Sequence, residues 1–115
     1  MHIRTHTKIP TNFAEFYEEY CFRVVATGLK GKTLEIYSKQ LSKCNGDVQK
    51  CLQIFANKQK VAAICKCYEM LHNSYEKVSK TWKKAEDLQK LPYIGPATCF
   101  ELACGIGLQS TAKAD

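Results

Sequence analysis

The sequence lacks any long run of apolar residues. No stretch approaches the roughly 18 apolar residues that a membrane-spanning helix needs, and the first eight residues contain no secretory apolar core. The alternation typical of β-strands, internal repeats and low-complexity tracts are absent as well. We therefore expect an all-α protein without a membrane partner, located inside the cell in the cytoplasm or nucleus.

Cysteine, in contrast, is plentiful. Seven Cys, an odd number, are scattered at positions 21, 44, 51, 65, 67, 99 and 104. In a helical chain this pattern favours free thiols that act as small core residues over a disulfide framework, and it indicates a reducing compartment. Cys65 and Cys67 lack the two-residue gap and the second pair that zinc sites use. We therefore expect neither a metal nor a cofactor.

Length and charge set broad limits on the protein. A chain of 115 residues fits one domain with one core. Hydrophobic residues make up 45% and charged residues 24%, which argues against intrinsic disorder. The net charge of +6 suits a polyanionic partner, but it is also common in small proteins that bind none. Charge alone therefore gives only weak support to nucleic-acid binding.

The apolar spacing predicts a compact bundle of about six helices. Residues 1–12 read as an extended leader, and residues 13–115 as one helical domain. Apolar side chains recur every three or four residues in four stretches, at about 13–26, 33–43, 48–55 and 58–73. The sequence Asn45-Gly46-Asp47 should end the second helix and cap the third. Residues 74–82 read as a polar, basic linker, and two hairpin helices complete the count.

The most informative stretch is residues 91–103, which read LPYIGPATCFELA. Pro96 is tolerated in the first turn of a helix, because the N–H that it lacks would have no partner there. Gly95 has no side chain, so backbone N–H groups at the start of that helix can approach a phosphate oxygen. We expect Thr81 to cap a short preceding helix that ends at Lys90. The stretch therefore predicts a turn that holds a nucleic-acid phosphate without reading the base sequence.

These residues resemble a helix-hairpin-helix element at about 83–107. Residues 91–115 also resemble the corresponding stretch of the endonuclease III-like superfamily of DNA glycosylases. The family's hairpin pattern is matched at Leu91, Pro92, Ile94, Gly95 and Thr98. Asp115 falls at the spacing where the family places its catalytic carboxylate.

The resemblance implies a role for each matched position. The partner would be DNA, held largely without sequence preference through its phosphate backbone. The residues expected to hold it are Tyr93, Gly95, Ala97 and Thr98 in the hairpin, with Lys83, Lys84 and Lys90 beside it. Asp115 would stabilise the positive charge that builds on the deoxyribose as a base is released, or position a water molecule.

The chain departs from the family at several positions. Tyr93 replaces the first hairpin glycine, which is unfavourable if that position needs a positive φ, although its phenol can stack or bond to the backbone. Ala97 stands where glycosylases with lyase activity carry a Schiff-base lysine, so only monofunctional chemistry is expected. Gly28 stands where many relatives insert a Gln into the base stack. Relatives continue past the catalytic Asp, so we expect a fragment or a truncated reading frame.

A glycosylase also needs a pocket, usually aromatic, for the extruded base. The aromatic candidates for such a pocket are Tyr17, Tyr20, Tyr37, Tyr68 and Trp82. Their spacing matches the buried faces of their helices, so we predict that most of them fill the core instead.

Four interpretations of the function stay open. The leading one is a DNA-binding domain that resembles a monofunctional glycosylase acting on a damaged or modified base. An enzyme of the same fold that modifies a hypermodified thymine fits the residues equally well. Gly28 and Tyr93 favour a non-catalytic DNA-binding module. In the fourth interpretation, a helical interaction protein, residues 91–96 form only an interhelical turn.

Overall fold

The computed structural model of the chain describes residues 10, 12–26 and 32–108. Within these residues every regular element is a helix, which confirms the all-α prediction. None of the described helices combines the length and the apolar character that crossing a membrane requires. The elements, in chain order, are α1 (Phe13–Val25), α2 (Lys32–Ser42), α3 (Val48–Ile54), α4 (Lys58–Leu71), α5 (Tyr75–Ser79), the 3-10 helix η1 (Ala85–Lys90) and α6 (Thr98–Gly105).

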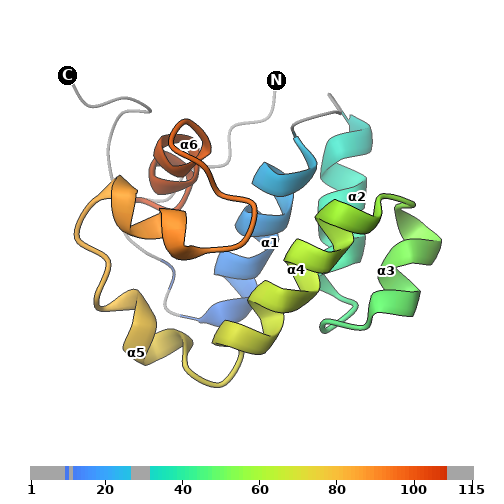
Figure 1. The fold of residues 1–115 in the computed structure, drawn as a ribbon, viewed down its shortest axis with the longest axis horizontal. Helices are drawn as coiled ribbons and strands as arrows, with labels where there is room; N and C mark the ends of the chain where they lie inside the picture. Colours follow the sequence, from blue (N-terminus) through green and yellow to red (C-terminus); the bar gives the residue numbers. More distant parts are fainter. Residues whose placement is uncertain (1–9, 11, 27–31, 109–115) are drawn as a thin grey trace.

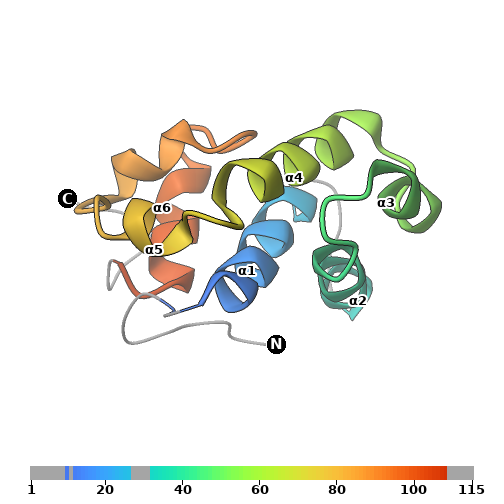
Figure 2. The same ribbon diagram turned by 90° about the horizontal axis from the view of Figure 1, so that it is seen from below.

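Helix α1 is the centre of the fold. The side chain of Asn12 caps its start by accepting a hydrogen bond from the Glu15 N–H at 2.9 Å. One face then carries Phe16, Tyr20 and Val24, whose side chains are fully buried. Figures 1 and 2 show α2, α3 and α4 on one side of α1, and α5, η1 and α6 on the other. A single hydrophobic cluster runs through both sides.

Helices α2, α3 and α4 follow the predicted bounds within two residues, because local signals fix their ends. Asn45 and Gly46 have φ values of 54° and 80°, so they turn the chain after α2 as predicted. A Cβ at Gly46 would lie 2.7 Å from the Tyr68 ring, so the turn also needs a residue without a side chain. Asp47 caps α3 through the Lys50 N–H, and Asn57 caps α4 through the Lys60 N–H, at 3.1 and 3.0 Å.

The prediction of a polar linker over residues 74–82 was wrong. Tyr75–Ser79 form helix α5, and both Tyr75 and Trp82 are buried. Their rings lie 5.3 and 5.1 Å from the ring of Phe16, centroid to centroid, and the Tyr75 hydroxyl donates to the carbonyl of Pro10 at 2.7 Å. Two aromatic side chains thus fix a segment whose remaining residues are mostly polar.

The prediction that Thr81 caps the first hairpin helix was also wrong. The Thr81 hydroxyl donates backwards to the Val78 carbonyl at 2.6 Å, and the helix is a 3-10 helix that begins only at Ala85. The carboxylate of Asp87 accepts from the N–H groups of Lys83 and Lys84 at 2.8 and 3.2 Å. These two hydrogen bonds lower the pKa of Asp87, because they favour its charged form.

Candidate nucleic-acid interface

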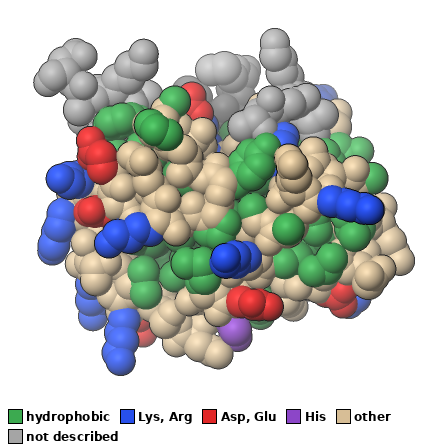
Figure 3. All heavy atoms as spheres, in the orientation of Figure 1, with side chains coloured by type: hydrophobic (Ala, Val, Ile, Leu, Met, Phe, Trp, Pro, Cys, Tyr) green, Lys and Arg blue, Asp and Glu red, His purple; other side chains and the backbone are tan. Residues whose placement is uncertain are grey.

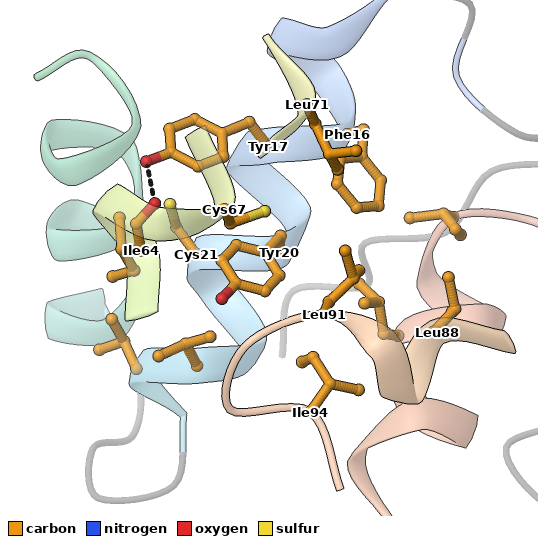
Figure 4. Packing of buried hydrophobic residues seen from close by; sticks show 14 of the residues in the cluster. Phe16, Tyr17, Tyr20, Cys21, Ile64, Cys67, Leu71, Leu88, Leu91 and Ile94 are labelled. Carbon is orange, nitrogen blue, oxygen red and sulfur yellow. Dashed lines mark hydrogen bonds between the residues drawn. The ribbon is translucent and has the colours of Figure 1, made fainter. Parts of the chain in front are cut away.

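The hairpin between η1 and α6 is held firmly on the core. Leu91 and Ile94 are 5% exposed, and the Ile94 N–H donates to the Leu91 carbonyl at 3.3 Å to close the turn. The Tyr20 hydroxyl of α1 donates to the Pro92 carbonyl at 2.7 Å. Figure 4 shows Tyr20 lying between α4 and the hairpin residues Leu91 and Ile94. The backbone of the turn is therefore positioned by its own buried Leu91 and Ile94 and by a buried tyrosine of α1.

Tyr93 occupies the tip of this turn with a φ of 68°. The position at which the sequence replaces a hairpin glycine therefore does adopt a left-handed backbone. A non-glycine residue in this conformation costs about 1–2 kcal/mol relative to glycine, because Cβ approaches a carbonyl oxygen. The Tyr93 side chain is 44% exposed. An aromatic ring thus projects from a strained position at the surface.

Gly95 faces open space. A Cβ built at this position meets no atom within 4 Å, and its φ lies outside the left-handed region. The backbone therefore does not require glycine here, and the role of Gly95 in admitting a phosphate stays a prediction. Any longer side chain would stand where an incoming group could approach the start of α6.

Several backbone amides at the start of α6 have no protein acceptor. Ala97 precedes α6 without a side-chain cap, and the first N–H with a backbone partner is that of Cys99, which donates to the Gly95 carbonyl at 3.0 Å. Among the described residues, the N–H groups of Gly95, Ala97 and Thr98 donate to no other group. Unpaired amides at a helix start attract anionic oxygen atoms.

Lysines surround the hairpin on the side of α5 and η1. Lys83, Lys84 and Lys90, which are predicted to contact DNA, are exposed. Figure 3 shows Lys and Arg side chains along this edge of the molecule, with acidic side chains between them. Residues 75–108 contain five Lys and four Asp or Glu, so the net charge of +6 is not concentrated here. The lysines are therefore individual exposed charges, and this part of the chain does not carry a strong overall field.

The predicted catalytic residue is not positioned by the described structure. Asp115 and Gly28 both lie outside the described residues. Within the described part of the chain, no three His, Cys, Asp or Glu side chains gather as a metal ion would require.

The predicted filling of the core by aromatic side chains is confirmed. Tyr17, Tyr20 and Trp82 are buried, and Tyr37 and Tyr68 are half-buried. The Tyr17 hydroxyl donates to the Ile64 carbonyl at 2.7 Å (Figure 4), and the Tyr20 hydroxyl also reaches the Ala63 carbonyl at 3.2 Å. Of these tyrosines, Tyr20 also contacts the hairpin, through the Pro92 carbonyl.

Nothing in the sequence indicates that an ion pair within α1 would be covered by α6. Glu19 is 1% exposed, and its carboxylate lies 3.2 Å from the Arg23 guanidinium one turn along α1. A Cβ at Gly105 would approach the same carboxylate to 2.6 Å, so the last turn of α6 sits directly on this pair. A Glu and an Arg four residues apart usually lie on an exposed helix face. The contact with α6 distinguishes the Glu19–Arg23 pair from such an exposed pair.

A search of protein-family models, curated proteins and solved structures finds no match to the chain. The functional interpretation therefore depends on the hairpin residues and their geometry.

Proposed function

We propose that the protein binds the sugar–phosphate backbone of DNA through the hairpin from Tyr93 to Thr98, without reading base sequence. The observation that carries the proposal is the combination of unpaired amides at Gly95, Ala97 and Thr98 with open space in front of Gly95. A phosphate oxygen would supply the acceptors that these amides lack, in the positive field of the α6 start. Such contacts fix the position of a nucleic acid and carry no sequence information.

The lysines beside the hairpin extend this proposed contact. Lys83, Lys84 and Lys90 are exposed and flank the turn along the chain. Each lysine that neutralises a phosphate releases condensed counterions, so affinity should fall as salt rises. Asp87 is a negative charge among these lysines: its carboxylate accepts from the backbone amides of Lys83 and Lys84, and the charges of Lys84 and Lys90 help to lower its pKa.

The test is fluorescence anisotropy with labelled DNA of several unrelated sequences over a series of salt concentrations. Gly95→Glu should weaken binding to all of them alike, by about 1–3 kcal/mol, because a carboxylate would replace the phosphate and repel it. Gln53→Glu is the matched control: it adds the same charge at an exposed position on α3, at the opposite end of the molecule from α5, η1 and α6 (Figures 1 and 2). Affinity that ignores salt, or a loss confined to one sequence, would contradict the proposal.

Base excision is the catalytic extension of this proposal, and it is supported by the resemblance to monofunctional glycosylases. Asp115 would stabilise the charge on the sugar, and Ala97 supplies no amine for strand cleavage. We expect release of a damaged or modified base from oligonucleotides by the full chain, and loss of that release in Asp115→Asn. Equal release by both proteins would remove Asp115 from the mechanism, whereas binding without any release would leave a DNA-binding module.

A further inference from the structure

Tyr93 differs from every other tyrosine of the chain. Each of the remaining five has a ring neighbour or a hydroxyl partner, and three of them are buried. Within the described residues, the Tyr93 ring packs against no other ring and its hydroxyl bonds to no group, while 44% of the residue is exposed. Tyrosine in this protein otherwise builds the core, so its placement at the hairpin tip needs a separate explanation.

The backbone conformation at Tyr93 gives a second reason to expect a specific role for this residue. Its φ of 68° suits glycine, and the turn is imposed from outside by the buried Leu91 and Ile94 and by the Tyr20 hydroxyl on Pro92. Glycine at position 93 would relieve the strain and leave those contacts in place. A strained residue that the fold does not need points to a role in binding a ligand.

We infer that Tyr93 stacks on an unpaired nucleobase, and that it thereby makes the hairpin prefer single-stranded or gapped DNA to intact duplex. The inference rests on the proposed function, since the hairpin must hold the adjacent phosphate. Every base has a flat aromatic face, so an exposed ring binds single strands with little sequence preference. In an intact duplex those faces are covered by neighbouring base pairs, and a ring at the phosphate backbone has nothing to stack on.

The position of Tyr93 in the hairpin suits this role. It lies two residues before Gly95, where an added Cβ would meet only open space, and directly after Pro92, whose carbonyl is fixed by Tyr20. Ring and amides therefore belong to one rigid turn. A nucleotide whose phosphate sits at the start of α6 would place its base within reach of a neighbouring side chain on the same turn.

The experiment compares Tyr93→Phe, Tyr93→Leu and Tyr93→Gly on a labelled oligothymidylate and on a blunt duplex of equal length. Tyr93→Phe should bind the single strand like the original protein, whereas Tyr93→Leu and Tyr93→Gly should bind it about tenfold more weakly. All three should bind the duplex within about twofold of the original affinity. Leu keeps the strain and the apolar bulk but not the ring, so it separates stacking from backbone effects.

Thermal melting of the same variants checks that they are folded. Tyr93→Gly should melt no lower than the original protein, because it relieves the left-handed strain. Single-strand binding that is unchanged in both Tyr93→Leu and Tyr93→Gly would overturn the inference, as would an equal loss on both DNA forms. If Gly95→Glu abolishes binding while those two variants bind normally, only the stacking role fails; if the original protein binds neither DNA, the proposed function fails with it.

Discussion

The two halves of the molecule differ in how their helices begin. In the half formed by α1 to α4, the side chains of Asn12, Asp47 and Asn57 cap the starts of three helices. In the half formed by α5, η1 and α6, Ser74 and Ala97 precede the two α-helices without any side-chain cap. Each of these three caps accepts one hydrogen bond from an amide at its helix start, whereas no side chain among the described residues caps the amides at the start of α6.

The halves also differ in the source of their stability. Helices α1 and α4 are 13 and 14 residues long and bury a full apolar face, whereas α5, η1 and α6 have five, six and eight residues. Such short helices are marginal on their own, so packing must hold them. Three residues of α1 provide that packing. Phe16 contacts Trp82, and the Tyr20 hydroxyl bonds to the Pro92 carbonyl. The buried Glu19 lies against Gly105. The amides at the start of α6 can therefore remain without protein acceptors, because packing against α1 stabilises the helices of the second half.

Alkaline pH should have the largest effect on the first half. Burial is the main cause that raises the pKa of eight groups, six of them in α1, α3 and α4: Tyr17, Tyr20, Cys21, Cys51, Cys65 and Cys67, with Tyr75 and Cys99 in the second half. A raised pKa stabilises the folded state below the ordinary value, which is 9.0 for Cys and 10.0 for Tyr, and this stabilisation is lost as pH rises further.

The free energy of unfolding should therefore decrease steadily above pH 9.0. Lys60 acts in the opposite direction, because burial lowers its pKa, but it is a single group. Urea titrations followed by circular dichroism, in the presence of a reductant and from about pH 7 to about pH 11, measure this dependence. An unfolding free energy that is constant across this range would mean that the thiols and phenols are already accessible to solvent.

Phe16→Ala should remove the main aromatic contact between α1 and the second half. Phe16 is fully buried, and its ring lies within 5.1 to 6.3 Å of Trp82, Tyr75 and Tyr20, centroid to centroid. Removing it should lower the free energy of unfolding by about 3–5 kcal/mol, because a cavity remains between α1, α5 and the segment before η1. Ile36→Ala, at a position 54% exposed, is the control and should change stability by less than about 0.5 kcal/mol.

Trp82 is the single tryptophan and lies in the second half against Phe16 of α1, so its fluorescence reports on the second half and on its contact with α1. In Phe16→Ala the fluorescence transition should occur at a lower urea concentration than the transition seen by far-ultraviolet circular dichroism, since the second half loses its main support. Coincident transitions would show that the halves unfold as one unit even without Phe16.

The sequence predicted the first half well because its signals are local. Asn45, Gly46 and Asp47 define a turn and a cap within three residues, and regular apolar spacing defines the helices around them. The second half depends on distant partners instead. Tyr75 and Trp82 bury against Phe16, about 60 residues away in the chain, so α5 could not be inferred from its own polar residues. The cap by Asp87 was missed because its carboxylate reaches back to amides that precede the 3-10 helix.

The same distinction applies to the candidate site. The spacing of Leu91, Ile94 and Gly95 was enough to predict a turn before a helix, and the turn is present. The φ of Tyr93 was not predictable, because Leu91, Ile94 and the Tyr20 hydroxyl impose it through tertiary contacts. Asp115 stays a prediction from spacing alone.

The smallest expected effect tests the difference in helix caps directly. Asn57→Ala removes the acceptor for the Lys60 N–H at the start of α4 and should lower the free energy of unfolding by about 1 kcal/mol. Ser74→Ala, at the start of α5, should change it by less than about 0.5 kcal/mol, because the Ser74 hydroxyl donates back to the Met70 carbonyl and caps nothing. Asn57→Asp keeps an acceptor and should preserve stability. Equal losses in the two alanine variants would mean that Ser74 caps α5 in solution. The difference in helix capping between the two halves would then depend on α6 alone.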